Sequence, residues 1–107
     1  QGYIAGSGGN ASLMAITRAL GGRSLEDGIR VVAVNPGQIK TERLVTILKT
    51  QALERFGDED RWEELIDPVF PPGNPQHIAD LVAFLASDLS GNTTGTVLTV
   101  DGGSCAR

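Results

Sequence analysis

The segment Gly28–Thr41, GIRVVAVNPGQIKT, decides the fold because its aliphatic run stops abruptly at Asn-Pro-Gly. The run, centred on Val31–Val34, is too short for a helix core and rich in β-branched residues, as in a strand buried on both faces of a parallel sheet. Pro36 lacks a backbone donor and Gly37 tolerates unusual dihedral angles, so a strand opened by Gly28 is expected to end there. Because ligands bind at the carboxyl ends of parallel strands, Asn35–Thr41 is the first candidate site.

A helix is expected before this strand. The glycine-dense stretch GYIAGSGG is too flexible for a stable helix start, so Asn10 is the predicted N-cap. Apolar and small residues then recur at helical spacing, and Gly21-Gly22 is expected to end the helix. The predicted inner face consists of Leu13, Met14, Thr17 and Leu20.

Three further elements are expected after Thr41. The first is a helical excursion, with Leu44, Val45, Leu48 and Ala52 on one face, a break at Gly57-Asp58 and a short helix carrying Trp62, Leu65 and Ile66. Asn74-Pro75 is a strong start for the next helix, because an N-cap residue precedes proline at the first helical position. The strand Thr96–Val100 follows and ends at Asp101-Gly102-Gly103.

The composition narrows the function classes. The 107 residues carry a net charge of −4 with a pI near 4.8, which disfavours nucleic acid as a partner. The single cysteine, Cys105, excludes an internal disulfide and fits a reducing compartment. No apolar run has the length of a membrane span and no leader opens the chain, so a cytoplasmic protein without a membrane partner is expected.

The order helix, strand, helical excursion, helix, strand predicts an α/β fold with crossovers between parallel strands. Two strands cannot by themselves form a parallel sheet covered on both sides, and the chain begins at Gln1 without methionine. We therefore expect the C-terminal part of a Rossmann-like doubly wound parallel sheet. Residues 1–107 are expected to form a single partial domain, with a variable substrate-loop insert at residues 42–73.

Four segments resemble the short-chain dehydrogenase/reductase family, in the order and at the spacing of that family. They are TRAL at 17–20, GIRVVAVNPGQIKT at 28–41, NPQHIADLVAFLASD at 74–88 and GTVLTVDGG at 95–103. The resemblance implies an oxidoreductase that binds NAD or NADP and exchanges hydride between the nicotinamide and an alcohol or carbonyl substrate. It also implies a homo-dimer or homo-tetramer, assembled through the helices at residues 10–20 and 78–86.

The resemblance assigns the cofactor-binding residues to Asn35–Thr41. Pro36 and Gly37 would shape the turn beside the nicotinamide, and Ile39 would offer backbone hydrogen bonds to its carboxamide. Thr41 would bond the carboxamide or the pyrophosphate. The same residues have a simpler interpretation, in which Asn35-Pro36-Gly37 only ends a strand and Thr41 only caps the helix that begins at Glu42.

The catalytic signature of the family is not intact. The family uses a tyrosine and, four residues later, a lysine that lowers the pKa of the phenol. Counting back from Thr17 places the lysine at Asn10 and the tyrosine at Gly6. Tyr3 is the only tyrosine in the chain and therefore the one candidate for the catalytic acid, with Ser7 where its lysine would stand. The alternative function is a non-catalytic cofactor-binding or interaction protein that retains the fold.

A second interpretation treats Gly2, Gly6 and Gly8 as phosphate-binding glycines, but it lacks the preceding strand and the acidic residue that such a site requires. The remaining candidates favour structural roles. His77 has no clustered partner, so no metal site is predicted. Cys105 has no activating neighbour in sequence, and Ser12 has no base near it. The acidic residues are expected to form a solvated face around Trp62; they are Asp58, Glu59, Asp60, Glu63 and Glu64.

Overall fold

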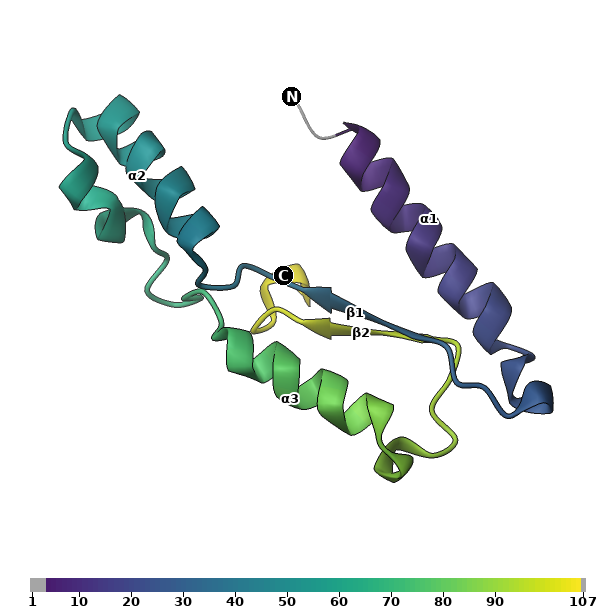
Figure 1. Ribbon diagram of the computed structural model, residues 1–107. Helices are drawn as coiled ribbons and strands as arrows, with labels where there is room; N and C mark the ends of the chain where they lie inside the picture. Colours follow the sequence, from purple (N-terminus) through teal and green to yellow (C-terminus); the bar gives the residue numbers. More distant parts are fainter. Residues whose placement is uncertain (1–3, 107) are drawn as a thin grey trace. The chain divides into compact units, whose positions relative to one another are not determined.

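The computed structural model describes residues 4–106 and has the expected order of elements. The two strands lie side by side and point in the same direction (Figure 1), which confirms the predicted α/β class. The helices and strands are α1 (Ile4–Gly21), β1 (Val32–Pro36), α2 (Glu42–Phe56), α3 (Pro75–Ala86) and β2 (Thr96–Val100). Short 3-10 helices separate them: η1 (Ser24–Asp27), η2 (Glu59–Leu65), η3 (Asp88–Ser90) and η4 (Ser104–Ala106).

The chain divides into two compact units. The first joins the residues up to Asn35 to Asp80–Thr99, and the second joins Pro36–Ala79 to the residues from Val100 onward. The first unit therefore holds α1 and almost all of the sheet. The second holds the loop after β1, α2 and the turn after β2.

In the first unit, α1 ends in close contact with the turn that leads into β2. A Cβ atom on Gly21 would lie 2.2 Å from the amide nitrogen of Gly95, so only glycine fits there. Gly95 has a φ of 65°, which also favours glycine, and its N–H donates to the carbonyl of Val31 at 2.8 Å. Two glycines thus let a helix end pack directly on the backbone of another segment.

The hydroxyl of Thr94 connects three segments of this unit. It accepts from the amide of Val31 at 3.0 Å and lies 3.1 Å from the carbonyl of Gly21, to which it donates. The hydroxyl of Ser24 is also 3.1 Å from it. Thr94 therefore fixes the end of α1, η1 and the entry to β1 through a single side-chain oxygen.

These contacts correct the predicted start of the first strand. The ladder begins at Val32 rather than at Gly28, because Val31 bonds to the Thr94 side chain and to Gly95 N before the strands pair. Gly28 has a φ of 71° and is the left-handed C-cap of η1. The predicted end is close to the observed one, since β1 stops at Pro36. Val32, Ala33 and Val34 are half-buried rather than fully covered.

The start of α1 is a second correction. Asn10 is not the N-cap: the helix begins at Ile4 and includes Gly6, Gly8 and Gly9. Each glycine costs about 1 kcal/mol relative to alanine, but once a helix is nucleated each added residue gains a hydrogen bond, so propensity alone does not set the boundary. On the predicted inner face Thr17 is buried, whereas Leu13 is 61% exposed.

Arg30 ties the entry of β1 to the end of α3. Its guanidinium donates to the carbonyl of Leu85 at 3.1 Å and also donates to the hydroxyl of Ser90. Ser90 is only 2% exposed and its hydroxyl donates to the same Leu85 carbonyl at 2.8 Å. The last carbonyls of a helix lack intrahelical partners, so these two side chains satisfy one of them.

In the second unit, α2 packs along η2 (Figure 1). Leu48 and Ala52 are buried on the predicted face, and Gly57 with a φ of 71° caps the helix as expected. The short helix around Trp62 forms, but as a 3-10 helix that ends at Leu65.

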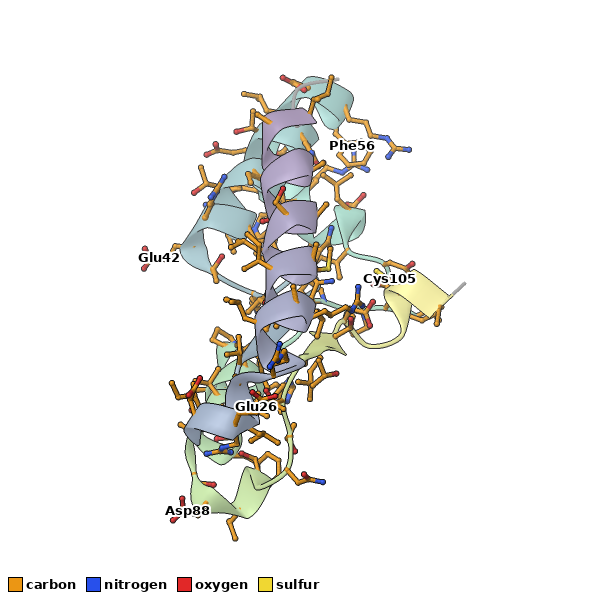
Figure 2. The ribbon with its side chains drawn as sticks, turned by 90° about the vertical axis from the view of Figure 1, so that its right-hand side faces the viewer. Glu26, Glu42, Phe56, Asp88 and Cys105 are labelled. Atoms are coloured by element: carbon orange, nitrogen blue, oxygen red, sulfur yellow. The ribbon has the colours of Figure 1, made fainter. Side chains whose placement is uncertain are left out.

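A cation-π contact joins the end of α2 to η2. The guanidinium of Arg61 lies 4.2 Å from the ring centroid of Phe56, which Figure 2 labels at the end of α2. Arg61 also forms an ion pair with Glu64 at 2.7 Å. The side chains of α2 and η2 are thus linked at their exposed junction.

The predicted start of α3 is confirmed. The side-chain oxygen of Asn74 accepts from Gln76 N at 2.8 Å, and Pro75 is the first helical residue. His77 takes the capping role that its position suggests, because its Nδ1 accepts from Asn74 N at 3.2 Å.

A turn built on Asp101 follows β2. The carboxylate accepts from the amides of Gly103 and Cys105, each at 2.8 Å, and from the hydroxyl of Ser104 at 3.1 Å. Hydrogen bonds from the thiol and the amide of Cys105 and from the amide of Gly103 lower the pKa of Asp101 to about 2. The same thiol bond raises the pKa of Cys105, so its thiol stays protonated at neutral pH. Cys105, labelled in Figure 2, is exposed.

Within residues 4–106, none of the helices combines the length and the apolar character that crossing a membrane requires.

We predict opposite effects of alanine at two glycines of α1. In the full-length protein, Gly21→Ala should lower the free energy of unfolding by about 1–3 kcal/mol, because the new Cβ overlaps the backbone of Gly95. Gly8→Ala is the matched control. It has nothing within 4 Å of the added atom and should raise the stability by up to about 1 kcal/mol. Urea unfolding measures both, and equal effects would contradict the close packing at Gly21.

We predict that the Cys105 thiol controls the ionisation of Asp101. The native pKa of Asp101, about 2, lies below the ordinary value of 3.8 for this carboxyl group, so its contribution to stability is present above pH 3.8 and is lost as the pH falls towards 2. Cys105→Ala should raise the pKa of Asp101 more than Ser104→Ala does, since the thiol bond is the largest cause of the shift. A carbon-detected NMR titration of the Asp101 carboxyl group distinguishes the two variants; an unchanged pKa in Cys105→Ala would refute the assignment.

Candidate functional site

The loop after β1 is held against the turn after β2. The N–H of Gly37 donates to the carbonyl of Val100 at 2.9 Å, which extends the pairing of the two strands by one residue. A Cβ on Gly37 would lie 2.6 Å from the Cβ of Asp101 and 2.8 Å from its Cα. The glycine of Asn-Pro-Gly is therefore required for packing, as well as for the turn that the sequence predicts.

A parallel bridge then fixes the rest of the loop. Gly73 N donates to the carbonyl of Gln38, and Lys40 N donates to the carbonyl of Gly73, both at 2.8 Å. Ile39 is the residue between these two bonds, and its Cδ1 lies 3.1 Å from the position of a Cβ on Gly73. The stretch just before α3 thus holds the candidate loop in an extended conformation.

This bridge determines where the backbone groups of Ile39 point. In this parallel bridge both hydrogen bonds to Gly73 come from the residues on either side of Ile39, which are Gln38 and Lys40. The N–H and C=O of Ile39 itself make neither bond. The N–H and C=O of Ile39 therefore point away from Gly73. They present one donor and one acceptor on the same residue, which matches a carboxamide group.

Thr41 is the N-cap of α2. It is exposed, its backbone is extended (φ −123°, ψ 164°) and its Oγ1 accepts from Leu44 N at 3.3 Å. Thr41 therefore caps the helix that begins at Glu42, as the sequence predicts. Because the hydroxyl serves the helix as an acceptor, its own O–H remains a donor. One side chain can thus cap the helix and donate to a bound group.

A cleft of about 470 Å³ lies beside this cap and favours anions. It is lined by Lys40, Thr41, Glu42, Val45, Thr46 and Lys49. The first amides of α2 and the two lysine ammonium groups are positive, and Glu42 is the one acidic lining residue. Lys49 was not predicted from the sequence as a residue of this site. The signal was present, because residues 42, 45, 46 and 49 lie on one face of a helix with a 3.6-residue period.

The other predicted site residues are distributed as follows. Asn35 and Pro36 are exposed at the end of β1. Gly6 and Asn10 both belong to α1, four residues apart, as the tyrosine–lysine spacing requires. Tyr3, the candidate catalytic acid, and Gly2 lie outside the described residues. Gly6 and Gly8 belong to a helix rather than to a loop, which contradicts the interpretation as phosphate-binding glycines.

The first part of α1 carries no proton-transfer group. From Ile4 to Thr17 the helix contains no Tyr, Lys, His, Asp, Glu, Cys or Arg, and Arg18 is its first ionisable residue. Across the residues described, no three His, Cys, Asp or Glu side chains gather in a group that could hold a metal ion.

The chain is similar to known proteins both in sequence and in structure. The family model described as enoyl-(acyl carrier protein) reductase matches residues 3–105. A Bacillus subtilis protein named uncharacterized oxidoreductase YxbG is 35% identical over 109 residues, which covers 99% of this chain and 38% of the relative. This chain therefore spans well under half of the length of that relative.

Two solved structures are similar to this chain. A short chain dehydrogenase family protein from Francisella tularensis is similar with a TM-score of 0.76 and 30% identity, over 91% of this chain and 41% of the other. The L-sorbose reductase of Gluconobacter frateurii, solved in complex with NADPH and L-sorbose, has a TM-score of 0.74 and 26% identity, over 86% of this chain and 36% of the reductase. With a family model that matches nearly its whole length, the chain belongs to the short-chain dehydrogenase/reductase family.

Proposed function

We propose that this chain is the nicotinamide-facing part of an NAD(P)-dependent oxidoreductase that exchanges hydride between the cofactor and an alcohol or carbonyl compound. The observation that carries the proposal is the Ile39–Gly73 bridge, which leaves the N–H and C=O of Ile39 directed away from Gly73. Membership of the family and the NADPH complex of the sorbose reductase support it.

The residues present fit a nicotinamide. A carboxamide needs one donor for its oxygen and one acceptor for its NH₂ group, and Ile39 offers both from its backbone. The hydroxyl of Thr41 would donate to the carboxamide or to the pyrophosphate, while the cleft with Lys40 and Lys49 favours the phosphate charge. Asn35, Pro36 and Gly37 would hold the loop at the strand end. When bound, the cofactor supplies the hydride chemistry, and the protein orients the reacting groups.

We also propose that residues 1–107 are one partial domain in which residues 42–73 form the substrate-loop insert. This insert contains α2 and η2, and it returns to the candidate loop through Gly73. The substrate would then be bound largely by the part of the chain that sequence reasoning marks as variable.

A non-catalytic cofactor-binding protein remains the second candidate, because a specific observation favours it. Gly6 and Asn10 stand where the tyrosine and lysine are expected, and α1 offers no ionisable group before Arg18. The two functions differ in turnover. Full-length protein that binds NADPH but converts no member of a panel of alcohols, ketones and sugars would favour the binding protein, whereas conversion of any member would exclude it.

Thr41 provides the direct test of the cofactor site. We expect Thr41→Ala to weaken NADPH binding about tenfold, because it removes a donor to a charged or polar cofactor group. Fluorescence titration of the full-length protein with NADPH measures the change. Thr41→Ser, which keeps the hydroxyl, should retain most of the affinity.

The control is Ser87→Ala, which removes another cap of the same kind: Ser87 caps η3 by accepting from Leu89 N at 3.3 Å. Both alanine variants should lose about 0.5–2 kcal/mol of stability, the usual cost of an N-cap. Only Thr41→Ala should lose NADPH affinity. Equal affinities in the two variants would show that Thr41 is a cap and no more.

We propose that the protein self-associates as a homo-dimer or homo-tetramer through residues 10–20 and 78–86. The support is that Leu13, Ile16 and Leu20 of α1 and Val82 and Phe84 of α3 are 45–61% exposed. Light scattering of the full-length protein should give a multiple of the monomer mass, and Leu13→Asp with Ile16→Asp should reduce it. A monomeric wild-type protein would contradict the proposal.

A further inference from the structure

The turn after β2 packs directly on the loop after β1. Both segments belong to the second unit, and the N–H of Gly37 donates to the carbonyl of Val100 at 2.9 Å. A Cβ on Gly37 would lie 2.6 Å from the Cβ of Asp101, so the backbone of Gly37 rests against that residue. The position of Asp101 therefore determines where Gly37 lies, two residues before Ile39.

Both carboxylate oxygens of Asp101 are used to close the turn. Oδ1 accepts from the amide of Gly103 at 2.8 Å, and Oδ2 accepts from the amide of Cys105 at 2.8 Å and from the hydroxyl of Ser104 at 3.1 Å. Gly102 and Gly103 have φ values of 64° and 84°, and glycine allows many other backbone conformations. The turn is therefore fixed by the Asp101 side chain rather than by its own backbone.

The loop after β1 is not fixed by packing at Gln38. This residue is exposed and lines a cavity of about 250 Å³, whose lining also includes Pro71 from the end of the insert and Asp101 and Ser104 from the turn. Backbone hydrogen bonds hold the loop on either side of this point, with β2 on one side and Gly73 on the other. The bond to β2 lies next to Asp101, so a change in the turn would reach the loop there.

The carboxylate of Asp101 is unsuited to proton transfer at neutral pH. Hydrogen bonds from Cys105 and Gly103 lower its pKa to about 2, so it is fully ionised and carries no proton to donate. As a base it is weak for the same reason. Its contacts therefore favour a structural effect on the loop over a part in the chemistry.

We propose that Asp101 is a positioning residue for the cofactor: by fixing the turn after β2, it holds Gly37 in place and so keeps the N–H and C=O of Ile39 in the orientation that a carboxamide requires. Asp101 itself does not touch the cofactor in this arrangement. The assignment rests on the proposed function, because the cofactor is the ligand of the loop that Asp101 holds.

The first test is NADPH binding to the full-length protein, measured by fluorescence titration. Asp101→Ala should weaken binding about tenfold, because a loosened loop must be ordered when the cofactor binds. Asp101→Asn keeps one acceptor oxygen of the two and should lie between Asp101→Ala and the wild type. An unchanged affinity in Asp101→Ala, or weaker binding in Asp101→Asn than in Asp101→Ala, would overturn the proposal.

Asp58→Ala is the matched control. Asp58 belongs to the same unit and caps a short helix in the same way, since its Oδ1 accepts from the amide of Asp60 at 3.0 Å. Its partner lies in η2 rather than in the turn after β2. The NADPH affinity of Asp58→Ala should equal that of the wild type, and a loss as large as that of Asp101→Ala would overturn the proposal.

The second test is amide hydrogen exchange by NMR in the cofactor-free protein. In Asp101→Ala the N–H of Gly37 should exchange about tenfold faster, because its bond to Val100 opens locally. The N–H of Gly95, which donates to Val31 in the first unit, is the internal reference and should exchange at the wild-type rate. Equal acceleration at both amides would show a general loss of stability, and no acceleration at Gly37 would show that the turn does not hold the loop. Either result would overturn the proposal.

The two tests separate this assignment from the proposed function. Wild-type protein that does not bind NADPH, with faster exchange confined to Gly37 in Asp101→Ala, would contradict the oxidoreductase proposal and leave the hold of Asp101 on the loop standing. Wild-type protein that binds NADPH, with affinity and exchange unchanged in Asp101→Ala, would contradict the role of Asp101 alone.

Discussion

The pairing of Gly73 with the loop after β1 is the constraint on which the candidate site depends. Two backbone hydrogen bonds of 2.8 Å extend the loop and leave the polar groups of Ile39 directed away from the pair. The close approach of Gly37 to Asp101 holds the other end of the loop. The arrangement therefore depends on backbone hydrogen bonds and on two glycines, Gly37 and Gly73, that allow close contact.

The sequence predicted the order and most of the boundaries, because strong local signals act there. Asn74 and Pro75 start α3 through a cap and a fixed φ, and Gly57 ends α2 in the left-handed conformation. The predicted starts of α1 and β1 were wrong, because they depend on effects that are not local. The start of α1 depends on cooperative helix propagation through the glycines. The start of β1 depends on tertiary bonds of Val31 to Thr94 and Gly95. Neither effect can be predicted from local residue patterns.

The candidate site was predictable in location but not in detail. A strand that ends at Asn-Pro-Gly identifies the loop, and the family resemblance assigns roles to Ile39 and Thr41, which stay predictions. The partner of the loop was not predictable, because Gly73 lies 34 positions after Ile39 and carries no side chain to indicate a role. The cavity of about 250 Å³ beside this loop was not predictable either, because its lining residues come from three segments that are distant in sequence.

The composition of α1 has a consequence for enzymology. A helix without an ionisable group from Ile4 to Thr17 cannot supply the acid or base whose titration shapes a bell-shaped pH–rate profile. Any inflection in the turnover of this protein between pH 5 and 10 must come from groups outside that stretch. Such an inflection would therefore report a proton donor that lies outside Ile4–Thr17.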